Sequence, residues 1–213
     1  MIWRDAVDWA ENLSYFDSVR NVTYDDWRLP TVQPIDGTGF DYDFSPAGNT
    51  DRGYNISAPG TAYTSSTGSE LAYMFHVNLG NLSAYDTSGV FRGGASGTDW
   101  GVVNTGLFLN LQNFVYWSGT EYAPYTNLAW RFYAYDGLQY AYGKDFAYHA
   151  WAVRSGDVAA PPSIPELRSL VGITATPSIP EPGSLMLVGL GLVGLGWTRR
   201  RRFDHLGEFP LKG

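Results

Sequence analysis

The chain contains no cysteine and only three histidines in its 213 residues. Without cysteine it has no disulfides and no thiolate metal ligands, so packing alone must hold its folded part together. His76, His149 and His205 lie far apart in the sequence and form no metal-binding or nucleophile–base motif. A G-x-S-x-G motif and a phosphate-binding glycine loop are also absent. We therefore expect a protein that is not an enzyme.

Basic side chains are scarce as well, with 14 lysines and arginines against 21 acidic residues. Residues 1–157 carry eight basic and seventeen acidic side chains, which gives this part a net charge of −9. An acidic surface repels phosphates and sulfates. We expect no nucleic-acid partner, and strongly sulfated polysaccharides are poor candidates.

One apolar run could span a membrane, the sixteen uncharged residues 183–198. As a helix they would measure about 24 Å, which is short of the roughly 30 Å of a hydrocarbon core. A buried helix is disfavoured because arginines follow the run directly and a proline-rich stretch precedes it. Positive charge beside a span stays on the cytoplasmic side, so the part before Pro180 should lie outside the cytoplasm.

The N-terminal stretch "MIWRDAVDWAENLSYF" lacks the basic start and apolar core of a signal peptide. Export needs such a signal. Our hypothesis is that Met1 is an internal methionine and that the gene product starts upstream. The alternative, a cytoplasmic tail-anchored protein, would place the arginines outside and violate the positive-inside rule.

The stretch "IPEPGSLMLVGLGLVGLGWTRRRR" resembles the PEP-CTERM sorting signal of Gram-negative bacteria. The resemblance is carried by Pro180, Glu181 and Pro182, by the apolar run, and by the arginines Arg199, Arg200, Arg201 and Arg202. It implies a transmembrane helix that anchors the chain in the inner membrane only transiently. It also implies an exosortase as partner, which cleaves the signal and releases the protein to the cell surface or extracellular matrix.

Two helices are predicted in the main domain. Apolar residues recur at helical spacing from Ile2 to Leu13 and indicate an amphipathic helix. Thr67-Gly68-Ser69-Glu70 reads as a capping box that begins a second helix, and Gly80 suits its end.

Strand signals follow in the second half of the domain. A strand is predicted around residues 115–117, and "NLAWRFYAYDGLQYAYG" alternates its side chains around a turn at Asp136-Gly137, which predicts a hairpin. Short strands are also expected at residues 27–29 and 150–154. Residues 33–66 are rich in glycine and polar side chains and read as one long loop.

This order of elements resembles the Lcl C-terminal domain family. The resemblance is carried by "DWRLPT" with Trp27, Arg28, Leu29 and Pro30, by "YWSGT" with Tyr116, Trp117 and Ser118, and by Val153-Arg154. It implies an α+β, C-type-lectin-like fold with two helices and a small antiparallel sheet, without established catalytic activity. The family's opening strand is missing here, which agrees with an upstream start.

Each motif residue has a structural and a binding interpretation. Trp27 and Trp117 could stack on sugars, but tryptophans flanked by strand residues are more often core. Arg28 and Arg154 could hold a ligand carboxylate, but we expect them to pair with carboxylates of the domain. We therefore expect the motif to be structural.

Two further candidates concern the loops. Asp41, Asp43 and Asp51 offer hard oxygen ligands and are the only cofactor candidates, for calcium, although their spacing does not fit the EF-hand pattern. We expect a solvated loop there instead. An exposed tyrosine patch could face carbohydrate or protein, with the candidates Tyr54, Tyr63, Tyr122, Tyr125, Tyr140 and Tyr142.

The expected organisation is a domain over residues 1–157, a proline-rich linker over 158–179, the sorting signal over 180–202 and a tail over 203–213. The expected function is a non-catalytic adhesion or carbohydrate-binding module at the cell surface, with a neutral polysaccharide or other surface proteins as partners. The alternatives are a purely structural envelope or biofilm component and a glycan-active enzyme, since paired carboxylates could meet in space.

Overall fold

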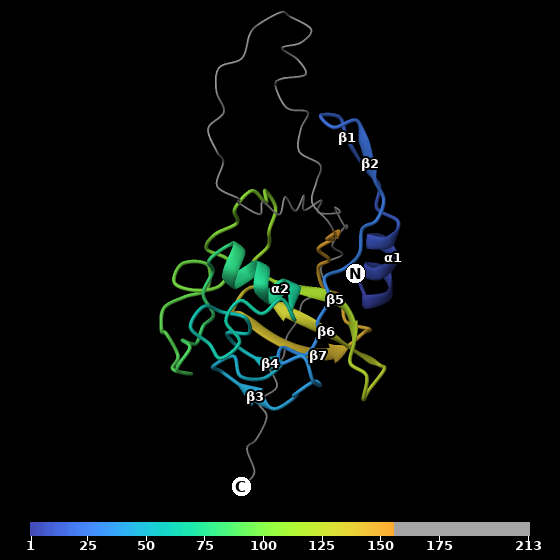
Figure 1. Cartoon of the computed structure of the whole chain (residues 1–213). Helices are drawn as coiled ribbons and strands as arrows, with labels where there is room; N and C mark the ends of the chain where they lie inside the picture. The colour runs from blue at the N-terminus through green and yellow to red at the C-terminus, as the bar shows by residue number, and fades with distance from the viewer. Residues whose placement is uncertain (156–213) are drawn as a thin grey trace, which may run out of the picture.

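The computed structural model describes residues 1–155, which fold into one α+β domain (Figure 1). The linker, the sorting signal with its expected transmembrane helix, and the tail lie outside the described residues. Within residues 1–155, no helix is long and apolar enough to cross a membrane.

The sheet that organises the domain has five strands in the order β3-β4-β7-β6-β5. All neighbouring strands pair antiparallel except β3 and β4, which are parallel. The strands are β3 Phe44–Ser45, β4 Arg52–Gly53, β5 Val115–Glu121, β6 Leu128–Tyr133 and β7 Leu138–Gly143. The predicted strand at 115–117 and the predicted hairpin are thus confirmed. The hairpin turn spans residues 134–137, and Gly137 adopts the positive φ of 82° that this turn needs.

Successive side chains of β6 lie on opposite faces of the sheet, as the alternating sequence pattern predicts. Phe132 packs on Phe75 of the second helical segment, with ring centroids 5.1 Å apart. This segment consists of α2, Glu70–Tyr73, and the π-helical turn η1, Met74–Asn78, and it covers one face of the sheet (Figure 1). Arg131 lies opposite Trp117 of β5 and Tyr140 of β7, and these three residues share the other face.

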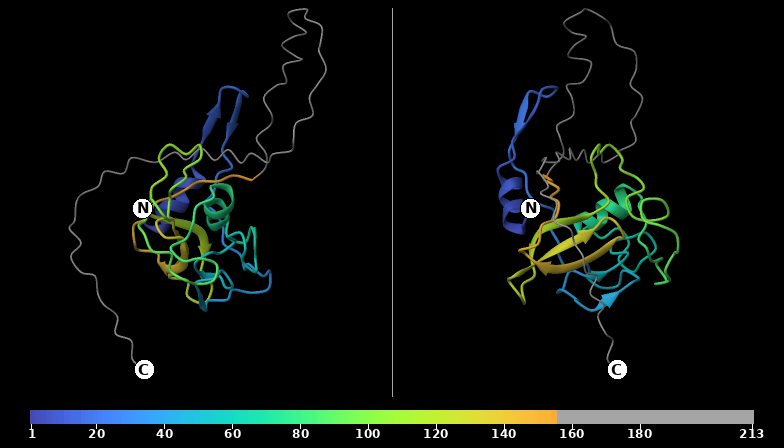
Figure 2. Two further views of the ribbon diagram at one scale, coloured as in Figure 1. Left: turned by 90° about the vertical axis from the view of Figure 1, so that its left-hand side faces the viewer. Right: turned by 180° about the vertical axis from the view of Figure 1, so that it is seen from behind.

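The first helix, α1 (Trp3–Glu11), is confirmed, and it packs beside β5. Trp3, Ala6 and Ala10 face the core at helical spacing. The indole Nε1 of Trp3 donates a hydrogen bond to the Ser118 carbonyl at 2.8 Å, which fixes the helix to the sheet. A two-stranded hairpin that the sequence did not reveal follows, β1 Tyr15–Asp17 and β2 Val22–Tyr24, and projects from the body of the domain in all views (Figure 2).

The predicted capping box is wrong. The N-cap of α2 is Ser69, whose Oγ accepts a hydrogen bond from the Ala72 amide at 3.3 Å. Glu70 does not reach back to the helix start because its carboxylate binds the guanidinium of Arg28. A charge-assisted, bidentate pair is a stronger interaction than a hydrogen bond to a neutral amide. Gly80 follows the last helical turn with a positive φ of 67°, as its predicted closing role requires.

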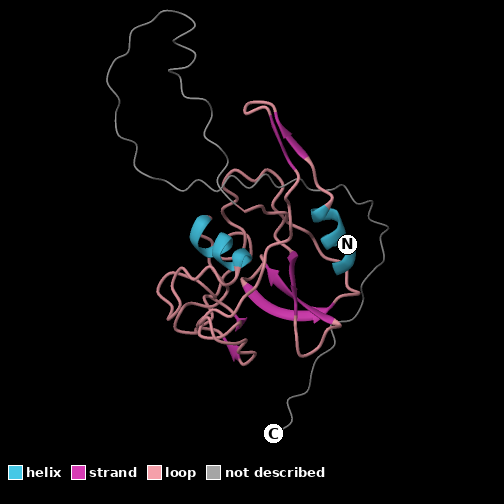
Figure 3. Cartoon of the chain, turned by 45° about the vertical axis from the view of Figure 1, so that its right-hand side comes forward, coloured by secondary structure: helices cyan, strands magenta, loops and turns pink. Residues whose placement is uncertain are grey.

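The predicted strands at 27–29 and 150–154 are reduced to a single bridge between them. The amide of Arg28 donates to the Val153 carbonyl at 2.9 Å, and the amide of Val153 donates back at 2.8 Å. The ladder ends there because Pro30 has no amide hydrogen. The expected loop at 33–66 in turn contains β3 and β4, although most of it is irregular, as Figure 3 shows.

Candidate functional site

The residues of the family motifs lie close together, and most of them are buried. Trp27, Leu29 and Trp117 are buried in the core cluster beneath α1. The indole of Trp27 donates to the Tyr24 carbonyl at 3.0 Å, and that of Trp117 donates to the Met1 carbonyl at 3.2 Å. Neither ring is available as a platform for sugars, so both tryptophans have the core position that we expected.

Both motif arginines form ion pairs with domain carboxylates. Arg28 binds Glu70 through two hydrogen bonds of 2.6 and 2.7 Å, and the Thr31 amide donates to the same carboxylate at 2.6 Å. Burial acts to raise the pKa of Glu70, but these hydrogen bonds outweigh it and lower the pKa. Arg154 binds Asp26 at 2.7 and 3.0 Å and lowers the pKa of that carboxyl. These pairs connect segments that are distant in the sequence.

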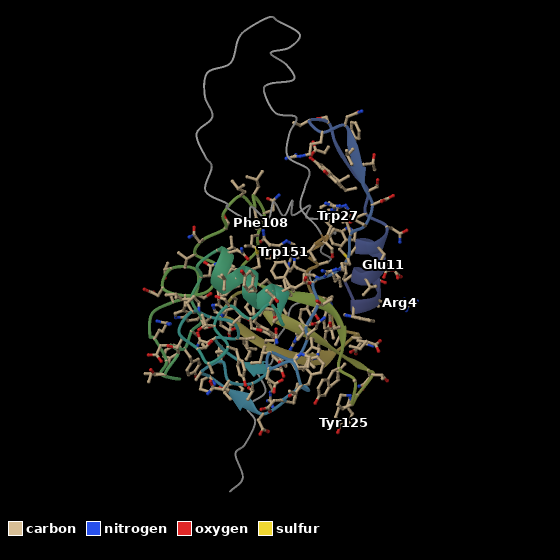
Figure 4. All side chains as sticks on the ribbon, in the orientation of Figure 1. Arg4, Glu11, Trp27, Phe108, Tyr125 and Trp151 are labelled. Atoms are coloured by element: carbon tan, nitrogen blue, oxygen red, sulfur yellow. The ribbon has the colours of Figure 1, made fainter. Side chains whose placement is uncertain are left out.

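A cavity of about 200 Å³ lies next to these pairs, between the α2–η1 segment and residues 151–154. Leu71, Met74, Trp151 and Val153 contribute apolar side chains to its lining. Trp151 is 6% exposed, and its indole Nε1 has no hydrogen-bond acceptor among the described residues. Figure 4 shows Trp151 beside α2, close to Phe108, whose ring centroid is 4.6 Å away. No pattern in the sequence predicted this cavity.

A second feature lies on the α1 side of the sheet, where tyrosines surround the buried Arg131. Its guanidinium carbon lies between 4.0 and 4.8 Å from four ring centroids, those of Tyr133, Tyr140, Tyr142 and Tyr148. Arg131 is only 1% exposed, and within the described chain its Nε and Nη1 atoms have no hydrogen-bond acceptor. Its Nη2 donates to the Tyr140 hydroxyl, which is 2.9 Å from the Tyr133 hydroxyl. We call these five residues the arginine–tyrosine cluster.

Ring contacts extend the cluster into a continuous aromatic strip. Tyr135 touches Tyr133 at one end, and Phe146 touches both Tyr142 and Tyr148 at the other. Successive centroids along the strip are 4.6 to 6.4 Å apart. Tyr142 is 37% exposed and Phe146 is 45% exposed, so the strip forms part of the surface. Its members are Tyr133, Tyr135, Tyr140, Tyr142, Phe146 and Tyr148.

The tyrosine patch expected from the sequence is only partly assembled. Tyr140 and Tyr142 belong to the strip, whereas Tyr122 is buried against Tyr42 with ring centroids 4.5 Å apart. Tyr63 packs against the core between α2 and the sheet. Tyr125 is exposed but lies at the other end of the domain from Trp151 in Figure 4. Sequence reasoning missed Tyr133 and Tyr148 because their common partner, Arg131, is visible only in three dimensions.

The calcium candidates Asp41 and Asp51 lie side by side, because the Asp51 amide donates to the Asp41 carbonyl at 3.0 Å, but their carboxylates bind backbone amides. Asp51 is buried, and its two oxygens accept hydrogen bonds from the amides of Ile35 and Asp41, at 2.9 and 2.8 Å. Asp41 in turn accepts from the amide of Asp43 at 2.9 Å. Burial raises the pKa of Asp51, which opposes the charged form that a cation requires. Among residues 1–155, no three acidic or histidine side chains are placed to hold a metal ion. The carboxylates instead order the loop.

Two buried titratable groups lie near the turn of the hairpin. Burial lowers the pKa of His76 to about 4, and the His76 ring nitrogens contact the Asn81 carbonyl at 3.1 Å and the Ser83 hydroxyl at 3.3 Å. Burial raises the pKa of Asp136 to about 6, and Asp136 accepts a hydrogen bond from Tyr54 at 3.3 Å. The Ser83 hydroxyl is fully buried and also accepts from the Asn55 amide, so it is placed to hold loops together.

Comparison with known proteins identifies the C-terminal signal. A family model described as the PEP-CTERM protein-sorting motif matches residues 178–202, which confirms the signal predicted at 180–202. No curated protein and no solved structure matches the chain. The motif implies that the chain is exported, and its described part is an α+β domain. More particularly, the motif implies an exosortase as the processing partner, with transient anchoring in the membrane before processing.

Proposed function

We propose that the protein is a non-catalytic polysaccharide-binding component of the bacterial surface or extracellular matrix. The aromatic strip is the observation that carries this proposal. Sugar rings present apolar C–H faces that pack on aromatic rings, and tyrosine hydroxyls add hydrogen bonds at the edges. A strip of consecutive rings suits an extended polymer better than a single small molecule.

Arg131 supports the proposal because it holds the rings in place. Its guanidinium makes cation–π contacts with four rings of the strip, so we expect these rings to be ordered before any ligand arrives. A preorganised surface loses less conformational entropy on binding than a mobile one.

The acidic charge of the domain points to a neutral polymer rather than an anionic one. The topology that fits is a domain on the periplasmic side, with the four arginines at 199–202 in the cytoplasm until exosortase cleavage. After cleavage the domain reaches the surface or matrix, where a neutral polysaccharide is an available ligand.

The test is affinity electrophoresis of the full chain, in detergent, through gels that contain a neutral polysaccharide such as dextran or galactomannan. We expect retardation of the wild-type protein and its loss in the variant Tyr142→Ala/Phe146→Ala. Tyr125→Ala is the matched control, because Tyr125 is 62% exposed and lies outside the strip. Equal loss in the control variant, or no retardation by any neutral polymer, would favour the purely structural role.

A further inference from the structure

The loop that leads into β5 carries the two most exposed large apolar side chains among residues 1–155. Leu109 is 94% exposed and Leu107 is 73% exposed. Phe108, between them, is buried, and its ring centroid lies 4.6 Å from that of Trp151. Phe108 therefore fastens the loop to residues 151–154, the last segment of the described chain, while both leucines project into solvent.

The β1–β2 hairpin adjoins the same terminal segment. The guanidinium of Arg154 lies 4.1 Å from the ring centroid of Tyr24, at the end of β2, and it also pairs with Asp26. In the turn of the hairpin, Val19 is 69% exposed, which is the next highest value after the two leucines. Figures 1 and 2 show the loop, the hairpin and the terminal segment at one end of the domain, opposite β3.

The loop is uncharged, although the domain around it is acidic. Residues 101–120 contain no charged side chain, whereas residues 1–157 have a net charge of −9. Anionic lipid headgroups repel acidic protein surfaces. An uncharged segment with projecting leucines is therefore the part of this domain that can approach a bilayer at the lowest electrostatic cost.

The course of the chain brings this end of the domain to a bilayer. The sorting motif implies transient anchoring in the membrane, and the uncharged run at 183–198 follows the described domain after only 27 residues, 156–182. Fully extended, 27 residues span at most roughly 90 to 100 Å. An anchored chain thus keeps the loop and the hairpin close to lipid, and such tethering makes a contact of a few side chains effective.

The form of the surface favours lipid over a protein partner. Side chains as exposed as Leu107 and Leu109 have few neighbours, so they project singly. A stable protein interface needs a contiguous surface of about 800 Å² on each partner. A fluid bilayer, in contrast, accepts single projecting apolar groups at the boundary between headgroups and acyl chains.

We propose that this end of the domain is a membrane-contact surface that touches the bilayer while the chain is anchored. Leu107 and Leu109 insert at the boundary between headgroups and acyl chains, and Val19 makes a second contact. Each of these side chains leaves water for an apolar phase, which is the driving force. The inference goes beyond the proposed function and is independent of it, because it concerns lipid and does not involve the aromatic strip.

The test uses the full chain in nanodiscs of phosphatidylcholine, with one fluorescent bimane label. Because the chain has no cysteine, Leu109→Cys or Val19→Cys directs the label to a single position. Spin-labelled phosphatidylcholine quenches bimane only at close range, and we expect it to quench the label at both positions. Absence of quenching at both would overturn the inference and leave a protein partner as the explanation of the exposed leucines.

The matched control is Phe44→Cys. Phe44 is also apolar and 54% exposed, but it lies in β3, at the opposite end of the domain (Figure 1). A label at this position should stay unquenched. Equal quenching at Phe44 and Leu109 would show that the domain lies on the bilayer without a preferred face, and this result would also overturn the inference.

The double variant Leu107→Gln/Leu109→Gln tests whether the leucines drive the contact. Both are exposed, so the near-ultraviolet circular dichroism of the domain should not change. The ratio of docked to undocked domain should fall roughly 10-fold or more, because two leucines no longer leave water, and quenching of the label in Val19→Cys should fall with it. Phe44→Gln should leave this quenching unchanged. Equal quenching with and without the two leucines would contradict the proposal.

Discussion

From the geometry of the arginine–tyrosine cluster we predict how Arg131→Met changes the free energy of unfolding. Arg131 is buried without a carboxylate partner within the described chain, and four tyrosine rings surround its guanidinium at 4.0 to 4.8 Å. Methionine has a similar length and fills much of the same volume without the charge. The substitution therefore removes the cation and leaves most of the packing.

Two opposing terms decide the sign of the change in stability. A desolvated cation–π contact stabilises by about 1 to 2 kcal/mol, so four rings provide roughly 4 to 8 kcal/mol. Burying an unpaired charge costs several kcal/mol, which offsets much of that gain. If the rings outweigh the burial, Arg131→Met should lower the free energy of unfolding by about 1 to 3 kcal/mol.

The measurement is urea unfolding of the full chain in detergent, followed by near-ultraviolet circular dichroism, which reports tyrosine order. The native-state signal should also weaken, since the rings lose their common partner. Arg52→Met is the control, because Arg52 lies over only two rings, Tyr42 at 4.9 Å and Phe44 at 5.8 Å, and should change stability by less than about 1 kcal/mol. Unchanged or increased stability of Arg131→Met would refute the reasoning, because the charge would then be a net cost.

Three further predictions concern pH, backbone and processing. Between pH 3.8 and about 6, the buried Asp136 holds a proton that the unfolded chain releases. Asp136 therefore lowers the free energy of unfolding as the pH rises, by up to about 3 kcal/mol. His76, whose pKa is lowered from 6.5 to about 4, acts in the opposite direction because the unfolded chain binds the extra proton. Asp136→Asn should therefore show a loss of stability on acidification from pH 6.5 to about 4, measured by urea unfolding. A pH-independent variant would contradict the His76 assignment, and the same pH dependence in wild type and variant would contradict that of Asp136. Gly53→Ala should destabilise the domain by more than about 2 kcal/mol, because φ is 142° and a Cβ would meet the Ser45 carbonyl. Gly80→Ala should cost only about 1 kcal/mol, because φ is 67° and a Cβ there would have no atom within 4 Å. Equal shifts of the melting temperature in the two variants would be inconsistent with the clash at Gly53. In a host with the exosortase, mass spectrometry of the surface fraction should find the protein without the residues after about Pro180, and an intact signal through Arg202 would exclude processing.

The parts of the fold that the sequence predicts are those with a sustained period. The hairpin of β6 and β7 alternates over six residues in each strand, and α1 repeats its apolar face over more than two turns. Strands β3 and β4 have two residues each, which is too short for any period to show. Their place in the sheet depends on the pairing of β4 with β7, a contact between segments more than eighty residues apart, and β3 joins through β4.

The candidate sites were harder to predict for a related reason. Tyr140 and Tyr142 could be named as patch residues, but Tyr148 lies outside the hairpin and reaches Arg131 only through tertiary folding. The sequence pattern did not distinguish Arg131 from an ordinary polar residue on a strand. The cavity depends on the meeting of α2 with residues 151–154, where the predicted strand is absent and only one bridge forms. A local pattern contains none of this information.

The neutral ligand that we propose follows from how the domain uses its few cations. Five of the eight basic side chains within residues 1–155 are in ion pairs, namely Arg4, Arg20, Arg28, Lys144 and Arg154. Arg92 donates to the Ser83 carbonyl, and Arg52 and Arg131 lie over aromatic rings. An anionic polymer would have to displace these partners and approach an acidic surface. Retardation by a neutral polysaccharide should therefore be unchanged between about 50 and 500 mM salt, because screening acts on exposed charges and leaves ring stacking intact. A steep loss of binding with salt would show that charge, and not the aromatic strip, holds the ligand.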